Sequence, residues 1–472
     1  MEKAIGEALS EWFAKELPEL VERDLDVPIK GDQVVILVGP RRAGKTYLLF
    51  QETERLLNEG YERRNIAYLD FEDLRLSRLR PEDFSAFTKS ISEHLREREG
   101  KIVLLLDEIQ RLDGWESWVR TLHNSGRYRI AVTGSSSRLS TAEVATQLRG
   151  RYIPRLVLPF SFREFLRTKR EITDPTAIVT PEDRGRILRL LREYLKWGGF
   201  PDVVKAEGEE RKAELLRVYR DTIFYRDVVE RFRVRDVSAL DSFSRMLGES
   251  FGKAFSISKA EKAFRSMGVK KSKRTLSEYL RYFESAFFVF TVEKVGYKAR
   301  ERALQPRKVY PVDPGIYGIY TRFSEDLGVV MECAVAVELL RRGYAGVGKL
   351  FYWRDYAGRE VDFVVRRGVR VEELIQVTYA SGSDEIMERE LEALARAARE
   401  LGCKKATVIT WDYEEGEEGG EEEGKGAVAV EYRLTAEKEK EGPGTGAGRS
   451  SMRFVPLWKW LLQPDGVHGK AE

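Results

Sequence analysis

The sequence predicts an α/β protein: a parallel sheet that carries a phosphate-binding loop, then a helical lid and a smaller α/β domain. Three observations predict this fold. Apolar runs alternate with polar helical segments from residue 34 to residue 160, a glycine-rich loop follows the first run, and two adjacent carboxylates end the third. Such alternation is typical of a parallel sheet covered by helices on both faces.

The first 23 residues place apolar side chains at helical spacing, which predicts an N-terminal docking helix that Pro18 interrupts. Five apolar runs then predict the strands of the sheet. They span residues 34–38, 66–69, 102–106, 130–133 and 153–158.

The loop after the first run fits the pattern G-x-x-x-x-G-K-[ST] and lies between a predicted strand and a predicted helix. It consists of Gly39, Pro40, Arg41, Arg42, Ala43, Gly44, Lys45 and Thr46. In such a loop the backbone N–H groups surround phosphate oxygens. Lys45 would neutralise the β- and γ-phosphates, and the Thr46 hydroxyl would bind Mg²⁺. We therefore expect ATP or ADP, with Mg²⁺, as ligands.

Two carboxylates, Asp107 and Glu108, follow the third apolar run. Charged groups at the end of a buried strand are costly, which favours a function for both. Asp107 would hold the Mg²⁺ shell, and Glu108 would orient the attacking water. The alternative is a surface strand end with solvated acids. The two motifs together predict an ATP hydrolase.

The composition excludes several other classes. With 42% hydrophobic and 34% charged residues, the chain is typical of globular proteins, and no apolar run approaches the length needed to cross a bilayer. The first residues lack the apolar stretch of a signal peptide, so we expect a cytoplasmic protein. Cys333 and Cys403 are too few for a disulfide framework or a zinc site. Abundant Arg, Glu and Lys with little Cys and Met are typical of thermophiles.

Four domains are expected along the chain. Residues 1–160 form the P-loop core, 161–248 a helical lid, 249–320 a basic domain, and 321–472 an α/β domain with an acidic, partly disordered insert at about 414–450. The lid is interrupted by a turn at 198–201, where two glycines precede Phe200 and Pro201. The apolar segment 456–462 is expected to dock back onto the last domain.

Residues 251–308 carry 15 Lys or Arg against 5 Asp or Glu, which indicates a surface for a polyanion. Expected helices at 258–267 and 273–283, with strands at 287–290 and 307–310, favour a winged helix that binds DNA. An ordinary helical subdomain with a solvated basic face is the alternative. The predicted DNA-binding residues are Lys270, Lys271, Lys273, Arg274 and Arg281.

Several motifs, taken in order, give the chain a resemblance to a known family. They are GPRRAGKT at 39–46, LDEIQ at 106–110, TGSSS at 133–137, LRGR at 148–151, LPFSFREF at 158–165, GGFP at 198–201 and YRDVV at 225–229. The chain resembles the archaeal and bacterial AAA+-type P-loop ATPases that carry a C-terminal domain similar to restriction endonucleases.

The resemblance implies two further catalytic roles. Thr133 or Ser135 would act as the polar sensor of the γ-phosphate or the attacking water, although a capping turn would also explain these residues. Arg149 or Arg151 would be an arginine finger that reaches the nucleotide of a neighbouring subunit, and a surface salt bridge is the alternative. A finger of this kind requires a homo-oligomer.

The resemblance also implies a nuclease-like site in the last domain, where cleavage needs a metal held by acids and an assisting lysine. Glu332 and Asp362 stand where the family has acids. Gln376 and Thr378 stand where active members carry Glu and Lys, so a carboxylate and the lysine charge are expected to be missing. The domain is therefore interpreted as a degenerate nuclease fold that binds DNA or a protein partner.

The leading hypothesis is an AAA+ ATPase that couples nucleotide state to DNA binding or remodelling. One alternative is a signalling ATPase that gates a protein partner, in which the basic face binds an acidic surface or the chain's own Glu-rich tract. The other is an ATP-powered, metal-dependent DNA nuclease.

Overall fold

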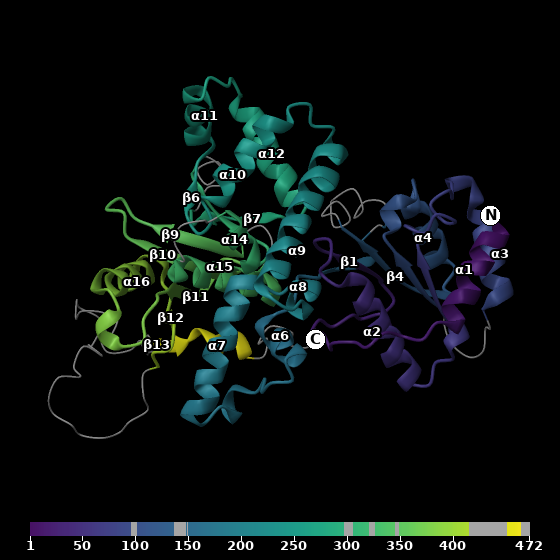
Figure 1. Ribbon diagram of the computed structural model, residues 1–472, viewed down its shortest axis with the longest axis horizontal. Helices are drawn as coiled ribbons and strands as arrows, with labels where there is room; N and C mark the ends of the chain where they lie inside the picture. The colour runs from purple at the N-terminus through teal and green to yellow at the C-terminus, as the bar shows by residue number, and fades with distance from the viewer. Residues whose placement is uncertain are drawn as a thin grey trace, which may run out of the picture.

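The computed structural model describes residues 1–95, 102–135, 148, 150–296, 305–320, 326–344, 349–414 and 451–463. Two sheets lie at opposite ends of the molecule, and the lid helices lie between them (Figure 1). Within these ranges, no helix has both the length and the apolar character needed to cross a lipid bilayer.

The first sheet has the strand order β2-β3-β4-β1-β5, and every neighbouring pair is parallel. This confirms the predicted five-stranded parallel sheet. Its strands are β1 (Val34–Val38), β2 (Ile66–Asp70), β3 (Ile102–Asp107), β4 (Tyr128–Gly134) and β5 (Tyr152–Leu156).

Helices cover both faces of this sheet. Val34 and Ile36 of β1 belong to one hydrophobic cluster with residues of α1, α3 and α4, whereas Val35 and Leu37 pack in another with α2. The predicted N-terminal helix is α1, and its Trp12 indole donates a hydrogen bond to the Ile66 carbonyl at 2.7 Å. These helices are α1 (Glu2–Ala14), α2 (Lys45–Asn58), α3 (Phe84–His94) and α4 (Trp115–Asn124).

The lid is helical, as predicted. It comprises α6 (Phe162–Thr168), α7 (Pro181–Trp197), α8 (Pro201–Lys205), α9 (Glu209–Thr222), a π-helical segment (Ile223–Glu230) and α10 (Val237–Gly248). The glycine pair at the end of α7 meets the distant Asp313, whose carboxylate accepts a hydrogen bond from the Gly199 N–H at 2.7 Å. A Cβ on Gly198 would lie 1.7 Å from an oxygen of Asp313, so this turn needs glycine.

The second sheet has eight strands in the order β13-β12-β11-β10-β9-β7-β8-β6. They are β6 (Ala254–Phe255), β7 (Val289–Lys294), β8 (Arg307–Pro311), β9 (Leu350–Arg354), β10 (Glu360–Arg367), β11 (Arg370–Val377), β12 (Lys405–Thr410) and β13 (Ser451–Pro456). Because β7 pairs with β9, this sheet crosses the boundary predicted at 320/321. A single hydrophobic cluster also runs from the lid to the last strands. The boundaries predicted at 248/249 and 320/321 therefore do not separate hydrophobic cores, whereas the five-stranded sheet has clusters of its own.

The remaining helices flank the second sheet or project from it. Helices α11 and α12 lie away from the five-stranded sheet, at the top of Figure 1. The C-terminal α17 packs against α6 of the lid, and the Arg163 guanidinium of α6 donates to the Leu462 carbonyl. These helices are α11 (Ile257–Ser266), α12 (Lys273–Ser285), α14 (Pro314–Tyr320), α15 (Leu327–Leu339), a π-helical segment (Leu340–Tyr344), α16 (Glu388–Leu401) and α17 (Leu457–Leu462).

Candidate functional site

The strand order brings three chain segments together at one edge of the first sheet. Since β4 lies between β1 and β3, its end at Thr133 lies between the glycine-rich loop after β1 and the carboxylates that end β3. In open parallel sheets, ligands bind at the carboxyl ends of the strands.

The glycines of the loop are required by the backbone. A Cβ on Gly39 would lie 1.9 Å from the Val157 carbonyl oxygen, so no side chain fits there. Gly44 has a φ of +94° at the point where α2 begins, which disfavours any residue with a Cβ. The loop can therefore approach a phosphate with its backbone N–H groups at the N-terminus of a 14-residue helix.

Lys45 is buried, and in the described part of the chain its charge has only a distant carboxylate partner. Its ammonium donates to the carbonyls of Gly39 at 3.2 Å and Pro40 at 3.0 Å, while the nearest carboxylate oxygen, on Glu108, is 3.8 Å away. Burial lowers the pKa of Lys45. An ammonium that is held mainly by backbone carbonyls is well placed to receive an anionic ligand.

Asp107 collects hydroxyl groups from three elements. Its carboxylate accepts hydrogen bonds from Thr46 at 2.7 Å, from Tyr68 at 2.8 Å and from Thr133. Next to it, burial, together with the charge of Asp107, raises the pKa of Asp70 to about 6. A carboxylate and the Thr46 hydroxyl in contact are the hard oxygen donors that Mg²⁺ prefers, so the residues fit that ion.

Glu108 adopts a left-handed backbone conformation, with φ +51°. Its backbone N–H donates to the Thr133 hydroxyl at 2.9 Å, and its carboxylate accepts a hydrogen bond from the Gln110 amide. These contacts hold the side chain beside Lys45. A non-glycine residue at positive φ is uncommon and is often found at functional sites.

Two arginines of the glycine-rich loop contact the lid. Arg41 donates to both carboxylate oxygens of Asp227, on the π-helical segment, at 2.9 Å. Arg42 forms a weaker, exposed pair with Asp202 of α8 at 3.4 Å. The loop and the lid are thus joined by ion pairs at the proposed phosphate site.

A buried network lies under the loop. The Arg23 guanidinium donates to the Ala43 carbonyl at 2.9 Å and to the Glu164 carboxylate at 2.9 Å. Burial would raise the pKa of Glu164, but Arg23 and Arg341 lower it to about 2. This network connects the loop, the lid and the π-helical segment that follows α15.

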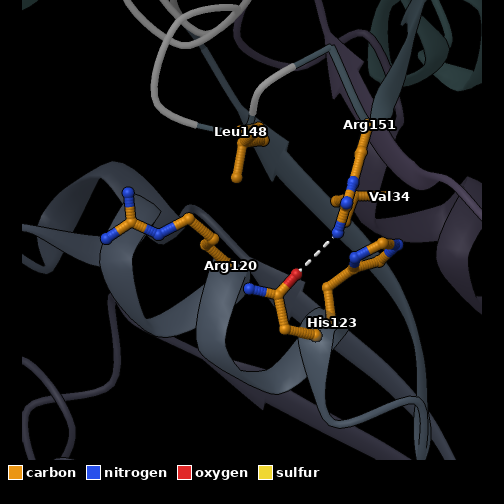
Figure 2. Close-up of a pocket in the computed structure, with 6 residues that line it drawn as sticks. Val34, Arg120, His123, Leu148 and Arg151 are labelled. Atoms are coloured by element: carbon orange, nitrogen blue, oxygen red, sulfur yellow. Dashed lines mark hydrogen bonds between the residues drawn. The ribbon is translucent and has the colours of Figure 1, made fainter.

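The structure places the two candidate sensors and one candidate finger. Thr133 contacts both Asp107 and Glu108, and Ser135 is buried at the end of β4. Arg151 lies at the opposite, amino-terminal edge of the sheet, where it donates to Asn124 at 2.8 Å beside Val34 and His123 (Figure 2). Arg149 lies outside the described residues.

The nuclease-like residues meet, and a lysine from outside the expected motif joins them. Glu332 of α15 and Asp362 of β10 lie together, and a lysine charge is present although Thr378 stands at the motif's lysine position. Lys308 of β8 binds Glu332, Asp362 and Glu360, so the charge comes from a strand more than 50 residues before Asp362. The side-chain oxygen of Gln376 is buried, and no described residue forms a hydrogen bond with it. Thr378 is buried directly after β11, and its N–H donates to the Ile409 carbonyl at 2.9 Å.

Four of the predicted DNA-binding residues lie at the start of α12, and Arg281 lies in its second half. Lys270, Lys273, Arg274 and Arg281 are exposed. The fifth, Lys271, is paired with Asp236 at 2.6 Å.

Sequence reasoning missed the roles of several residues. Tyr68 lies two residues before Asp70, within an apolar run that gave no sign of function. Gln110 and Asp227 belong to the motifs LDEIQ and YRDVV, so a polar residue within each motif was an available signal. Lys308 stood among many basic residues, and nothing local distinguished it.

The fold and this site define a P-loop nucleotide-binding domain. Residues 31–166 match the family model described as an AAA domain, residues 188–327 match a domain of unknown function (DUF8612), and residues 327–421 match another (DUF4143). The restriction-endonuclease resemblance of the last domain has no counterpart in these matches.

The chain belongs to the family of the uncharacterized protein MJ1544 of Methanocaldococcus jannaschii. The two are 31% identical over 444 residues, which cover 94% of this chain and 91% of that protein. An uncharacterized protein of Haemophilus influenzae is 33% identical over 340 residues, 71% of this chain and 80% of its own length. Among solved structures, the Walker-type ATPase paby2304 of Pyrococcus abyssi aligns with a TM-score of 0.40 and 16% identity, over 68% of this chain and 95% of that one.

Proposed function

We propose that this protein hydrolyses ATP at the edge of the five-stranded sheet and uses the nucleotide state to control a DNA-binding surface. The observation that carries the first part is the position of Glu108, whose carboxylate is held beside Lys45 while its backbone is fixed by Thr133. A carboxylate fixed in this way can accept a proton from an attacking water.

Each residue of the site has a distinct task. Lys45 and the backbone N–H groups of the loop bind the phosphates, and Thr46 and Asp107 would hold Mg²⁺. When bound, this ion neutralises charge that develops on the phosphate oxygens. Glu108 orients the water and takes its proton, and Thr133 keeps the backbone of Glu108 in place.

ATP turnover tests the catalytic assignment. Glu108→Gln should lower turnover by about 10²–10⁴-fold, the range for loss of a general base, while nucleotide binding persists. Asp113→Asn is the matched control, because it removes one exposed carboxylate from the same loop. Equal turnover in the two variants would exclude Glu108 as the base.

The second part of the proposal concerns DNA. The order helix, strand, helix, helix, strand, strand from α10 to β8, with β8 paired to both β6 and β7, supports a winged-helix arrangement. The exposed bases at the start of α12 would face phosphates. The Lys271–Asp236 pair joins the start of α12 to that of α10, and the Arg41–Asp227 pair joins the glycine-rich loop to the lid. Movement of the lid would therefore reach α12.

DNA binding can be tested by charge removal. In Lys270→Ala/Lys273→Ala/Arg274→Ala, the slope of log affinity against log salt should fall by about one for each phosphate that is no longer neutralised. The control removes three exposed bases from the ATPase core: Lys3, Arg64 and Arg78. If both triple variants bind duplex DNA as the wild type does, α12 is not the DNA surface.

We also propose an arginine finger in trans, from Arg149 or Arg151. Arg151 precedes β5 at the edge of the sheet opposite to Lys45, about 16 Å away along a five-residue strand. It is therefore too far to serve its own nucleotide, and an adjacent copy in a homo-oligomer would receive it. Arg151→Ala should then lower ATP turnover but leave ATP affinity unchanged; unchanged turnover in both Arg149→Ala and Arg151→Ala would exclude the finger.

A further inference from the structure

A single lysine lies at the centre of the nuclease-like cluster. Lys308 is 1% exposed, and its ammonium is 2.8 Å from Glu332, 2.7 Å from Glu360 and 2.9 Å from Asp362. The carboxylates come from α15 and β10, whereas the lysine comes from β8. Within the described residues, no group of three His, Cys, Asp or Glu side chains is arranged to hold a metal ion.

We infer that the Lys308 ammonium takes the place of the divalent cation that a nuclease-like site would hold, and that these carboxylates form a cation site only when Lys308 is removed. The residues present do not fit a metal as long as the ammonium is there. This inference does not depend on ATP hydrolysis.

The contacts around the cluster support a closed site. Each carboxylate already has an oxygen directed at the ammonium, and two of them have a further donor. The Tyr310 hydroxyl donates to Glu332 at 2.6 Å, and the Val377 N–H donates to Asp362 at 3.0 Å. A Mg²⁺ or Mn²⁺ ion would need these same oxygens at about 2.0–2.2 Å. It would also lie close to a buried like charge, which is strongly unfavourable at low dielectric.

One unsatisfied oxygen indicates what the site could bind without the lysine. The β10–β11 register pairs Phe363 with Ile375, which places Gln376 directly opposite Asp362. The side-chain oxygen of Gln376 is buried and has no hydrogen-bond partner in the part of the chain that the structure describes. Removal of the ammonium would therefore leave three carboxylates and an amide oxygen, a hard donor set that suits Mn²⁺ or Mg²⁺.

The cluster also joins two regions of the chain. Lys308 lies in the segment that matches DUF8612, and the three acids lie in the segment that matches DUF4143. The ammonium thus bridges the two segments as a structural ion would. The wild-type protein should then cleave no DNA through this site.

The test is Mn²⁺ binding to the full chain, measured by the EPR signal of free Mn²⁺ without nucleotide. All proteins carry Asp107→Asn, so that the ATPase site lacks its metal carboxylate. The parent should bind no Mn²⁺ through Asp362, whereas Lys308→Ala should gain one site, at least about tenfold tighter than any site in the parent. Adding Asp362→Asn should abolish the gain. Lys212→Ala, which removes another buried, paired lysine, should gain nothing.

Two outcomes would overturn the inference. One is Mn²⁺ binding, or Mn²⁺-dependent cleavage of duplex DNA, in the parent that Asp362→Asn removes. The other is a folded Lys308→Ala variant that gains no site. If Lys308→Ala fails to fold, Lys308→Met/Glu332→Gln carries less uncompensated charge and keeps Glu360, Asp362 and Gln376 as donors. If this double variant folds but does not bind Mn²⁺, the inference is also overturned. The measurement on the parent needs no Lys308 variant.

Discussion

Two buried lysines, Lys45 in the ATPase core and Lys308 in the second sheet, differ in what surrounds their charge. Lys45 is 5% exposed and Lys308 is 1% exposed. The ammonium of Lys45 is held by two backbone carbonyls, whereas that of Lys308 contacts three carboxylates. Burial lowers the pKa of Lys45; burial acts in the same direction on Lys308, but Asp362 and Glu332 raise its pKa well above the ordinary value.

The contrast shows that the partners of a buried charge, and not its burial, separate a binding residue from a structural one. Two buried acids follow the same rule. Glu164 is paired with arginines and has a pKa of about 2, whereas burial raises the pKa of Asp313, held by two backbone N–H groups, to about 7. In these two pairs, the charges held mainly by backbone groups, Lys45 and Asp313, are the ones that can respond to a ligand or to pH.

The largest expected effect separates the two lysines by stability. Lys308→Met should lower the free energy of unfolding by about 3–5 kcal/mol, because it leaves buried carboxylates without their cation. Lys45→Met should change it by less than about 1 kcal/mol, because it removes a buried cation whose one carboxylate partner among the described residues, on Glu108, is 3.8 Å away. Urea unfolding of both variants against the wild type measures the difference.

ATP turnover should show the reverse order, with Lys45→Met inactive. The comparison fails if the two substitutions destabilise the protein equally. A large loss for Lys45→Met would mean that Glu108 at 3.8 Å already serves as its counter-ion.

The second prediction concerns how the two buried acids, Asp313 and Glu164, make the free energy of unfolding depend on pH. The pKa of Asp313 is raised to about 7 in the folded protein from an ordinary value near 4, so the folded state keeps a proton there that the unfolded state has lost. Its contribution to stability should therefore fall as pH rises from about 4 to about 7, by on the order of 2–4 kcal/mol. Urea unfolding across this range, compared with Asp313→Asn, isolates the slope.

Glu164 supplies the opposite sign. Its folded pKa of about 2 lies below the ordinary value, so its contribution is fully present above about pH 4.5 and is lost as pH falls towards 2. If Asp313→Asn has the same slope as the wild type between pH 4 and 7, Asp313 does not titrate there. Two backbone N–H donors would then be enough to keep the buried Asp313 carboxylate ionised.

The P-loop core could be predicted from the sequence because its signals are local. An apolar run, the loop from Gly39 to Thr46 and the pair Asp107–Glu108 each occupy a few adjacent residues. Strand order then brings their ends together. Thr133 was expected only from the family resemblance, and the strand order then places its hydroxyl against Asp107 and the Glu108 N–H.

The Lys308 cluster could not be predicted, because its members are joined only by the second sheet. Lys308 and Asp362 are 54 residues apart, and their strands are not neighbours in that sheet. Arg23 and Glu164 are likewise 141 residues apart in the sequence, and only the fold brings them together. A charge count places such residues on a basic or acidic surface, while the fold buries and pairs them.

A third prediction concerns the hydroxyl that positions the acids opposite Lys45. Thr133→Val keeps the shape of the side chain but removes the acceptor for the Glu108 N–H and the donor to Asp107. Turnover of ATP should fall by roughly 10–100-fold, in line with misplacement of a catalytic group. Thr133→Ser should remain within a few-fold. If the valine variant is as active as the serine variant, the acids are positioned without this hydroxyl.

The smallest expected effect tests whether Arg41, whose charge is paired with a carboxylate, can be made available to a ligand as Lys45 is. Arg41 has a counter-ion, Asp227, which raises its pKa although burial opposes this. In Asp227→Asn, Arg41 would resemble Lys45 and its charge would be available to the phosphates. The Kd for ATP should then decrease by about 3–10-fold, equivalent to about 1 kcal/mol, in an equilibrium binding measurement.

Asp202→Asn is the control, because it removes the partner of the exposed Arg42 in the same loop. Solvent already screens that pair, so ATP affinity should change by less than about twofold. Weaker ATP binding in Asp227→Asn would show that Arg41 must be held by the lid before the loop can bind phosphate. The ion pair would then be part of the binding-competent state, and the rule drawn from the two lysines would not extend to this arginine.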